Sequence, residues 1–179
     1  MDTLLDILKY TIPALIVLIA TAIIVHKFLI AETRKKQLSI FQEGLQDSVR
    51  LRLQAYERLT VLLERMHPRA IIPRFYHPGM TVRDLQYALV NSIKEEFEHN
   101  LSQQVYVSTQ VWNTVVGVKE QEMAMINQIA STLNPDDSAK ALHQRVLDYV
   151  MKSDGEALPV EIGLDIIRNE AKLVLSQKA

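Results

Sequence analysis

Two patterns of hydrophobic and polar positions divide this chain: one continuous apolar run near the start, and apolar positions three or four residues apart over most of the rest. The run, residues 10–30, reads YTIPALIVLIATAIIVHKFLI. A helix needs about 20 apolar residues to cross a bilayer, and this run is apolar on all sides rather than along one stripe. It therefore predicts an N-terminal transmembrane anchor over residues 1–31.

The flanks of the run separate an anchor from a cleaved signal and orient it. The start, MDTLLDILK, has no basic leading region, and no small-residue cleavage site follows the run. One base, Lys9, precedes the run and several follow it, and basic flanks stay in the cytoplasm. The N-terminus is therefore expected outside and the rest of the chain in the cytoplasm. The residues expected at the membrane interface are Tyr10, His26, Lys27, Arg34, Lys35 and Lys36.

The segment 32–66 is predicted to be one long juxtamembrane amphipathic helix, which can continue directly from the anchor. Its apolar positions recur every three or four residues: they are Leu38, Phe41, Leu45, Val49, Leu53, Tyr56, Leu59, Leu63 and Met66. Such a stripe has to be buried against something. Two interpretations remain open: packing onto the helices that follow, and self-association of two chains.

Three prolines interrupt the pattern at residues 67–80. Pro68, Pro73 and Pro78 lie five residues apart, and each disfavours a helical conformation at the residue before it. An extended, turned, Pro-rich connector is expected here. Thr81 then has the chemistry of an N-cap, with Asp84 in the position of a capping box.

About four further helices are predicted in residues 81–177, which together with 32–66 should form one all-α cytoplasmic domain. They cover 82–100, a helix with Ser108 as its N-cap that ends at Asn134-Pro135, a helix capped by residues 136–138 that ends near Lys152, and one from Pro159 to about Gln177; the stretch 103–108 between the first two is partly β-prone. Their expected inward faces are, in order, Leu85, Leu89, Ile93 and Phe97; Trp112, Val116, Lys119, Met123, Ile126, Ala130 and Leu133; Leu142, Val146, Tyr149 and Val150; and Ile162, Ile166, Ile167, Val174 and Leu175.

Charge is unevenly distributed, although the formal net charge is only −1. Residues 27–83 carry 11 bases and 5 acids, whereas residues 84–179 carry 8 bases and 14 acids. The basic half follows the anchor directly. Two interpretations are open: attraction to anionic lipid headgroups, and ordinary solvated helix faces. The absence of cysteine is compatible with a reducing compartment.

Only one pair of residues has the spacing of a metal site. Glu96 and His99 lie three residues apart, which is the spacing that supplies half of a carboxylate-bridged di-iron site in helical bundles. No second Glu-x-x-His occurs, so a site would have to be shared across a dimer. The alternative is an exposed helix end in which Glu95 pairs with His99. No phosphate loop, zinc-binding HExxH helix or nucleophile elbow is found, so no enzyme, cofactor or small-molecule substrate is predicted.

Three stretches carry a resemblance to a known family. The blocks LRLQAYERLTVLLERMHP, FYHPGMTVRDLQ and EEFEHNLSQQVYVS, together with the sequence between them, look like an uncharacterised family of single-pass membrane proteins of Bacteroidota; the resemblance covers about residues 51–133. It implies a bacterial inner-membrane location and supplies no activity.

These features favour a membrane-tethered helical adaptor or scaffold that binds a partner protein, such as another inner-membrane protein, or itself. Tethering raises the effective concentration of whatever the domain binds. The alternatives are an accessory or stalk subunit of a larger membrane complex and a metal-dependent enzyme. Nucleic-acid binding is not expected, because the bases alternate with acids and lie close to lipid.

Overall fold

The computed structural model describes residues 2–152 and 157–176, and it is helical throughout apart from short turns. The side chains of residues 2–8, 10, 13 and 14 lie outside this description. The first helix, α1, runs without interruption through Asp2–Met66. The prediction of an all-α chain is confirmed for the described residues, in which the β-structure is limited to a single bridge between Thr81 and Ser138.

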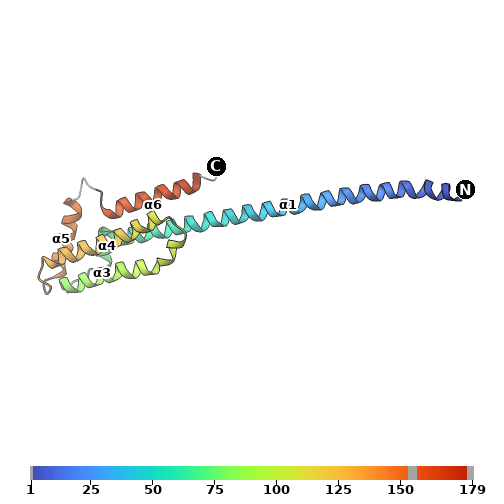
Figure 1. Ribbon diagram of the computed structural model, residues 1–179. Coiled ribbons are helices and arrows are strands. Elements are labelled where there is room, and N and C mark those ends of the chain that lie inside the picture. Colours follow the sequence, from blue (N-terminus) through green and yellow to red (C-terminus); the bar gives the residue numbers. More distant parts are fainter. Residues whose placement is uncertain (1, 153–156, 177–179) are drawn as a thin grey trace. The chain divides into compact units, whose positions relative to one another are not determined.

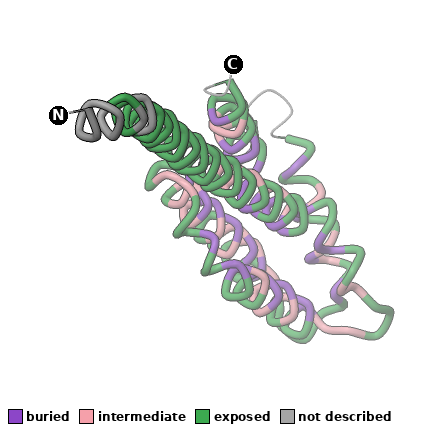
Figure 2. The backbone as a smooth tube through the Cα atoms, turned by 90° about the vertical axis from the view of Figure 1, so that its right-hand side faces the viewer, coloured by how far each residue is buried: buried purple, intermediate pink, exposed green. Residues whose placement is uncertain are grey.

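The chain divides into two compact units, residues 1–48 and 49–179. The first unit is the N-terminal part of α1 alone, and all its described side chains are exposed. The first partly buried position of α1 is Val49, which belongs to the second unit. In Figure 2 the described side chains of this segment are coloured as exposed throughout. Leu38, Phe41 and Leu45 of the predicted stripe are therefore uncovered in the described chain.

The second unit is a helical bundle that contains the last turns of α1. It continues with α2 (Pro68–Phe75), α3 (Val82–His99), the 3₁₀ helix η1 (Leu101–Val105), α4 (Thr109–Ser131), α5 (Ala139–Lys152) and α6 (Pro159–Ser176). Helix α4 packs on α3 and also on α6 (Figure 1). Residues 49–66 of α1 pack beside α3, α4 and α6 as the fourth helix of this group. The Tyr56 hydroxyl forms a hydrogen bond with Glu170 of α6, and Arg65 forms an ion pair with Glu96 of α3. Helices α2 and α5 pack on α3.

The core of this bundle is formed by the apolar positions that recur along its helices. Tyr56, Leu59, Leu63 and Met66 of the α1 stripe are buried, as are all four predicted positions of α3. Gly163 marks a close helix contact: a Cβ placed there would lie 2.9 Å from Leu63 Cδ1 and 3.0 Å from Val118 Cγ2. The absent side chain at Gly163 therefore allows α6 to approach α1 and α4.

Helix boundaries and caps largely follow the prediction. Thr81 and Asp84 form the expected capping box at the start of α3, and Ser108 caps α4 through the backbone nitrogen of Val111. These hydrogen bonds satisfy donors that the first turn of a helix leaves open. The four later helices begin within one or two residues of their expected positions.

Two local predictions are wrong. Residues 68–75 form helix α2 rather than an extended segment: Pro68 occupies the first turn, where its missing N–H costs little, and the apolar Ile71 and Ile72 are buried in the core. The β-prone stretch after α3 begins as the 3₁₀ helix η1, in which Gln103 is buried. In both cases burial against neighbouring helices outweighs local propensity.

Two inward faces also need correction. In α6, Ile162 and Leu175 are exposed, whereas Val160 and Leu164 are buried in their place. In α5, Leu142, Val146 and Val150 are buried as expected, but Tyr149 remains exposed.

Candidate functional site

The first candidate is the apolar surface of α1. From Leu15 onward this helix contains an 18-residue window with a mean hydropathy of 2.2, none of it buried in the structure. The helix is thus long and apolar enough to cross a membrane, which at about 1.5 Å per residue takes about 20 residues.

The predicted interface residues are all on α1. His26, Lys27, Arg34 and Lys35 are exposed, and Lys36 is exposed with its Nζ 3.9 Å from a Glu32 carboxylate oxygen. The Tyr10 side chain lies outside the described residues. Arg34, Lys35 and Lys36 form a short cationic stretch after the apolar run of residues 10–30, and Lys27 lies near the end of that run.

Glu96 and His99, the predicted metal pair, are used differently. Glu96 Oε1 forms ion pairs with two arginines, with Arg65 Nη2 at 2.8 Å and Arg74 Nη2 at 3.4 Å. These contacts connect α3 to α1 and α2, so this carboxylate already has two cationic partners. No group of three or more potential metal ligands occurs among the described residues. Glu95 accepts a hydrogen bond from Asn91 rather than from His99.

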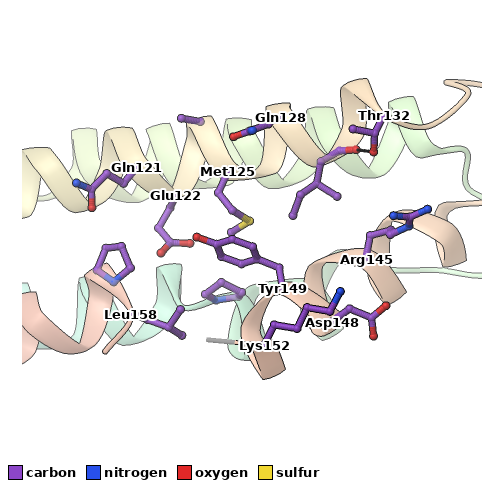
Figure 3. Close-up of a pocket in the computed structure, with 14 residues that line it drawn as sticks. Gln121, Glu122, Met125, Gln128, Thr132, Arg145, Asp148, Tyr149, Lys152 and Leu158 are labelled. Atoms are coloured by element: carbon purple, nitrogen blue, oxygen red, sulfur yellow. Dashed lines mark hydrogen bonds between the residues drawn. The ribbon is translucent and has the colours of Figure 1, made fainter. Parts of the chain in front are cut away.

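A pocket in the bundle is the second candidate. It has a volume of about 670 Å³, within the range of small-molecule sites. Its walls come from α4 and α5 and from the starts of α2 and α6 (Figure 3). The lining residues are Pro68, Gln121, Glu122, Ala124, Met125, Gln128, Ile129, Thr132, Arg145, Asp148, Tyr149, Lys152, Leu158 and Pro159.

Glu122 is the unusual member of this lining. Its side chain is only 3% exposed, and its Oε2 has no hydrogen-bond partner among the described residues. Burial raises the pKa of Glu122 from 4.5 to about 7, because the charged form loses its hydration. Figure 3 shows the carboxyl group directed into the pocket, toward the ring of Tyr149 and the thioether of Met125.

The other charges of the pocket stand on one helix. Arg145, Asp148 and Lys152 lie three or four residues apart on α5, so they share a face, and all three are exposed. None of them contributes to the shift in the Glu122 pKa, whose only cause is burial. Among the described residues, the buried carboxyl group therefore has no ion-pair partner of the kind that Glu96 has in Arg65 and Arg74.

Sequence reasoning missed Glu122 because it places the first part of the inward face of α4 one residue too far along; further on, the predicted Ile126 and Ala130 are buried as expected. The predicted face begins Trp112, Val116, Lys119, Met123, and these positions are only half-buried. The buried face is Val111, Val115, Val118, Glu122, Ile126 and Ala130. The available signal was the 4-3-4-4-4 series of these positions, in which one acid replaces an apolar residue.

A cluster of hydrogen bonds around Glu170 of α6 connects this helix to α1 and to the start of α4. The Tyr56 hydroxyl donates to Glu170 Oε1 at 2.6 Å, the Ser108 backbone N–H donates to the same oxygen at 3.2 Å, and the Ser108 hydroxyl donates to Glu170 Oε2. Burial alone would raise the pKa of Glu170, but the hydrogen bonds from Ser108 and Tyr56 outweigh it and lower this pKa. The cluster is fully paired, and we interpret it as structural.

Comparison with known proteins identifies a family without assigning an activity. Residues 2–174 match the family described as "Family of unknown function (DUF7935)". No curated protein and no solved structure matches the chain.

Proposed function

The chain belongs to the family of unknown function DUF7935, and from this premise we propose that it is a membrane-anchored helical adaptor that binds a partner protein, or a second copy of itself, at a bacterial inner membrane. One observation supports the proposal above the others. The apolar window of α1 is entirely exposed in the structure, and a surface of this size needs a lipid or protein environment to cover it.

The orientation in the proposal follows from charge. Arg34, Lys35 and Lys36 follow the apolar run of residues 10–30 and Lys27 lies near its end, whereas Lys9 alone precedes it. The bundle would then lie in the cytoplasm, and the cationic stretch would face anionic headgroups at about 1 kcal/mol per base near the surface. The earlier resemblance to inner-membrane proteins of Bacteroidota points the same way.

The adaptor role draws on apolar residues beyond the window. Leu38, Phe41 and Leu45 repeat at spacings of three and four and are all more than half exposed. These positions lie on one face of α1. Water exposure of such a stripe is unfavourable, so a partner helix or a second copy is the expected cover.

Cysteine cross-linking in native membranes tests the adaptor role, because the chain has no cysteine of its own. Phe41→Cys places a thiol on the stripe, and the control Glu43→Cys places one about 200° around the same helix. A disulfide-linked dimer formed by Phe41→Cys alone supports self-association. A tag at Ala179 then recovers any stoichiometric companion for mass spectrometry. Equal cross-linking of both variants, with no companion recovered, refutes the adaptor role.

Membrane attachment and orientation are tested separately. Ser131→Cys puts a thiol at the exposed end of α4. In spheroplasts, a membrane-impermeant maleimide should label this thiol only after permeabilisation, and alkaline carbonate should leave the protein in the membrane fraction. Labelling of intact spheroplasts contradicts the proposed orientation.

One alternative keeps a specific observation in its favour. Helix α1 is continuous from Asp2 through Met66, as a stalk subunit of a larger membrane complex would need. The helix ends at Met66, two residues before Pro68, which shortens any such stalk. Recovery of a fixed set of membrane-complex subunits with the tagged chain would favour this role over self-association. A metal-dependent enzyme draws no support from Glu96, which is paired with two arginines.

A further inference from the structure

The pocket around Glu122 combines a buried acid with apolar walls, and the adaptor role makes no use of it. Four residues of the lining present hydrocarbon or a thioether: Met125 and Ile129 on α4, Leu158 just before α6, and Pro159 at the start of α6. Such walls bury the apolar part of a small molecule favourably, at roughly 25 cal/mol per Å² of surface.

The polar requirement of the pocket is equally specific. Glu122 is 3% exposed, its Oε2 is unpartnered among the described residues, and the carboxyl group is aimed into the cavity (Figure 3). Unpaired buried polar groups are rare in native proteins. What this oxygen lacks is a hydrogen-bond donor, and a ligand entering the pocket can provide one.

The charges decide which donor fits best. An anionic ligand would be repelled by Glu122, and the two bases of the lining, Arg145 and Lys152, are exposed on α5 with Asp148 between them. A neutral donor would form the hydrogen bond to Glu122 but would not balance the negative charge of its carboxylate. A cationic donor forms the hydrogen bond and balances the charge, and charge-assisted hydrogen bonds are about twice as strong as neutral ones.

We propose that this pocket binds a small organic cation, a primary ammonium group on an apolar body, with the ammonium donating to Glu122 and the hydrocarbon packed on Met125 and Ile129. The site is independent of the adaptor role. It needs no partner chain, and its lining lies wholly within the bundle.

Three six-carbon probes separate the possible ligand classes: hexylammonium, hexanol and hexanoate. The full-length chain is reconstituted in lipid nanodiscs with ¹³C-labelled methionine methyl groups. Met125 lines the pocket, whereas Met66 and Met80 do not and serve as internal references. Titration at pH 8 should shift the Met125 signal with hexylammonium at lower concentration than with hexanol, and hexanoate should bind most weakly.

Two variants assign the effect to a residue. Glu122→Gln should weaken hexylammonium binding at least tenfold and leave hexanol binding within threefold of the original. Asp148→Asn removes the exposed acid of the same lining and should change neither by more than threefold. All these variants are compared in identical nanodiscs, so partitioning of the probe into lipid cancels.

The pH dependence gives a test that needs no variant. An alkylammonium group, like lysine, stays charged well above neutral pH, and the other titratable groups of the lining are Arg145, Asp148, Tyr149 and Lys152. Because Glu122 titrates at about pH 7, hexylammonium affinity should fall about tenfold between pH 8 and pH 6. Tighter binding of hexanoate, unchanged amine binding in Glu122→Gln, or a loss in Asp148→Asn equal to that in Glu122→Gln would overturn the proposal.

Discussion

Replacing Glu122 with glutamine should stabilise the bundle, and it should do so increasingly as the pH rises. Burial raises the pKa of this carboxyl group from 4.5 to about 7, so the folded state holds its proton more tightly than the unfolded state. The original protein is therefore most stable below pH 4.5 and loses stability as the pH rises to 7. Above pH 7 the loss is complete.

The magnitude follows from the shift. A difference of one pKa unit corresponds to about 1.4 kcal/mol, so the shift at Glu122 corresponds to about 3 kcal/mol above pH 7. A neutral glutamine does not titrate. The free energy of unfolding of Glu122→Gln, minus that of the original, should therefore increase by about 2–3 kcal/mol between pH 5 and pH 8.

A single fluorophore makes this measurement specific to the bundle. Trp112 is the only tryptophan, and it stacks on Phe97 with ring centroids 5.4 Å apart. Urea unfolding of the full chain in mild detergent, followed by Trp112 emission, reports the packing of α4 on α3. Glu120→Gln, an exposed carboxyl group two residues away, is the matched control and should show no such pH-dependent gain. A difference for Glu122→Gln that stays constant within 1 kcal/mol from pH 5 to pH 8 would refute the reasoning.

Three further substitutions test the helix contacts and the anchor. Gly163→Ala should destabilise the bundle by about 1–3 kcal/mol in urea unfolding, because its Cβ would lie 2.9 Å from Leu63 Cδ1. Tyr56→Phe should cost about 1–2 kcal/mol by the same assay, because Glu170 loses a hydrogen bond in a part-buried site. Ile19→Arg should make the protein extractable by alkaline carbonate, because a central arginine costs about 3 kcal/mol in a membrane helix.

Each of these substitutions has a matched control in the chain. Gly117→Ala adds the same methyl group to a helix where it meets no described atom within 4 Å, so it should be neutral or stabilising by up to about 1 kcal/mol. Tyr87→Phe alters a tyrosine that is 73% exposed and should be silent. Ile19→Leu should remain in the membrane. Equal losses from Gly163→Ala and Gly117→Ala would show that helix propensity, rather than contact, is being measured.

The sequence was sufficient for the helices whose apolar positions are unambiguous. Leu85, Leu89, Ile93 and Phe97 repeat every four residues without a competing series, and all four are buried. Caps were predictable for a similar reason: the hydroxyl and carboxylate of a capping box act within one turn. Local chemistry of this kind depends on no distant part of the chain.

The sequence was insufficient where two registers are both apolar. Helix α4 carries Trp112, Val116 and Met123 beside Val111 and Val115, and only the positions of α3 and α6 decide which series faces inward. The same limit applies to α2, which is helical because Ile71 and Ile72 find a core to enter. The pocket was beyond reach for this reason: it is formed by four helices brought together, and no single stretch of sequence encodes it.

Two acids of the bundle show that the fold can pair a carboxylate when structure alone requires it. Glu170 accepts hydrogen bonds from Tyr56 and Ser108, and its pKa is lowered in spite of burial. Glu122 is more deeply buried, and its Oε2 has no such donor among the described residues. An apolar residue at this position of α4 would match the valines before it and avoid a loss of about 3 kcal/mol at neutral pH. Retaining the acid therefore makes sense if the pocket binds something that supplies the missing donor, and the pH dependence of the Met125 signal measures that directly.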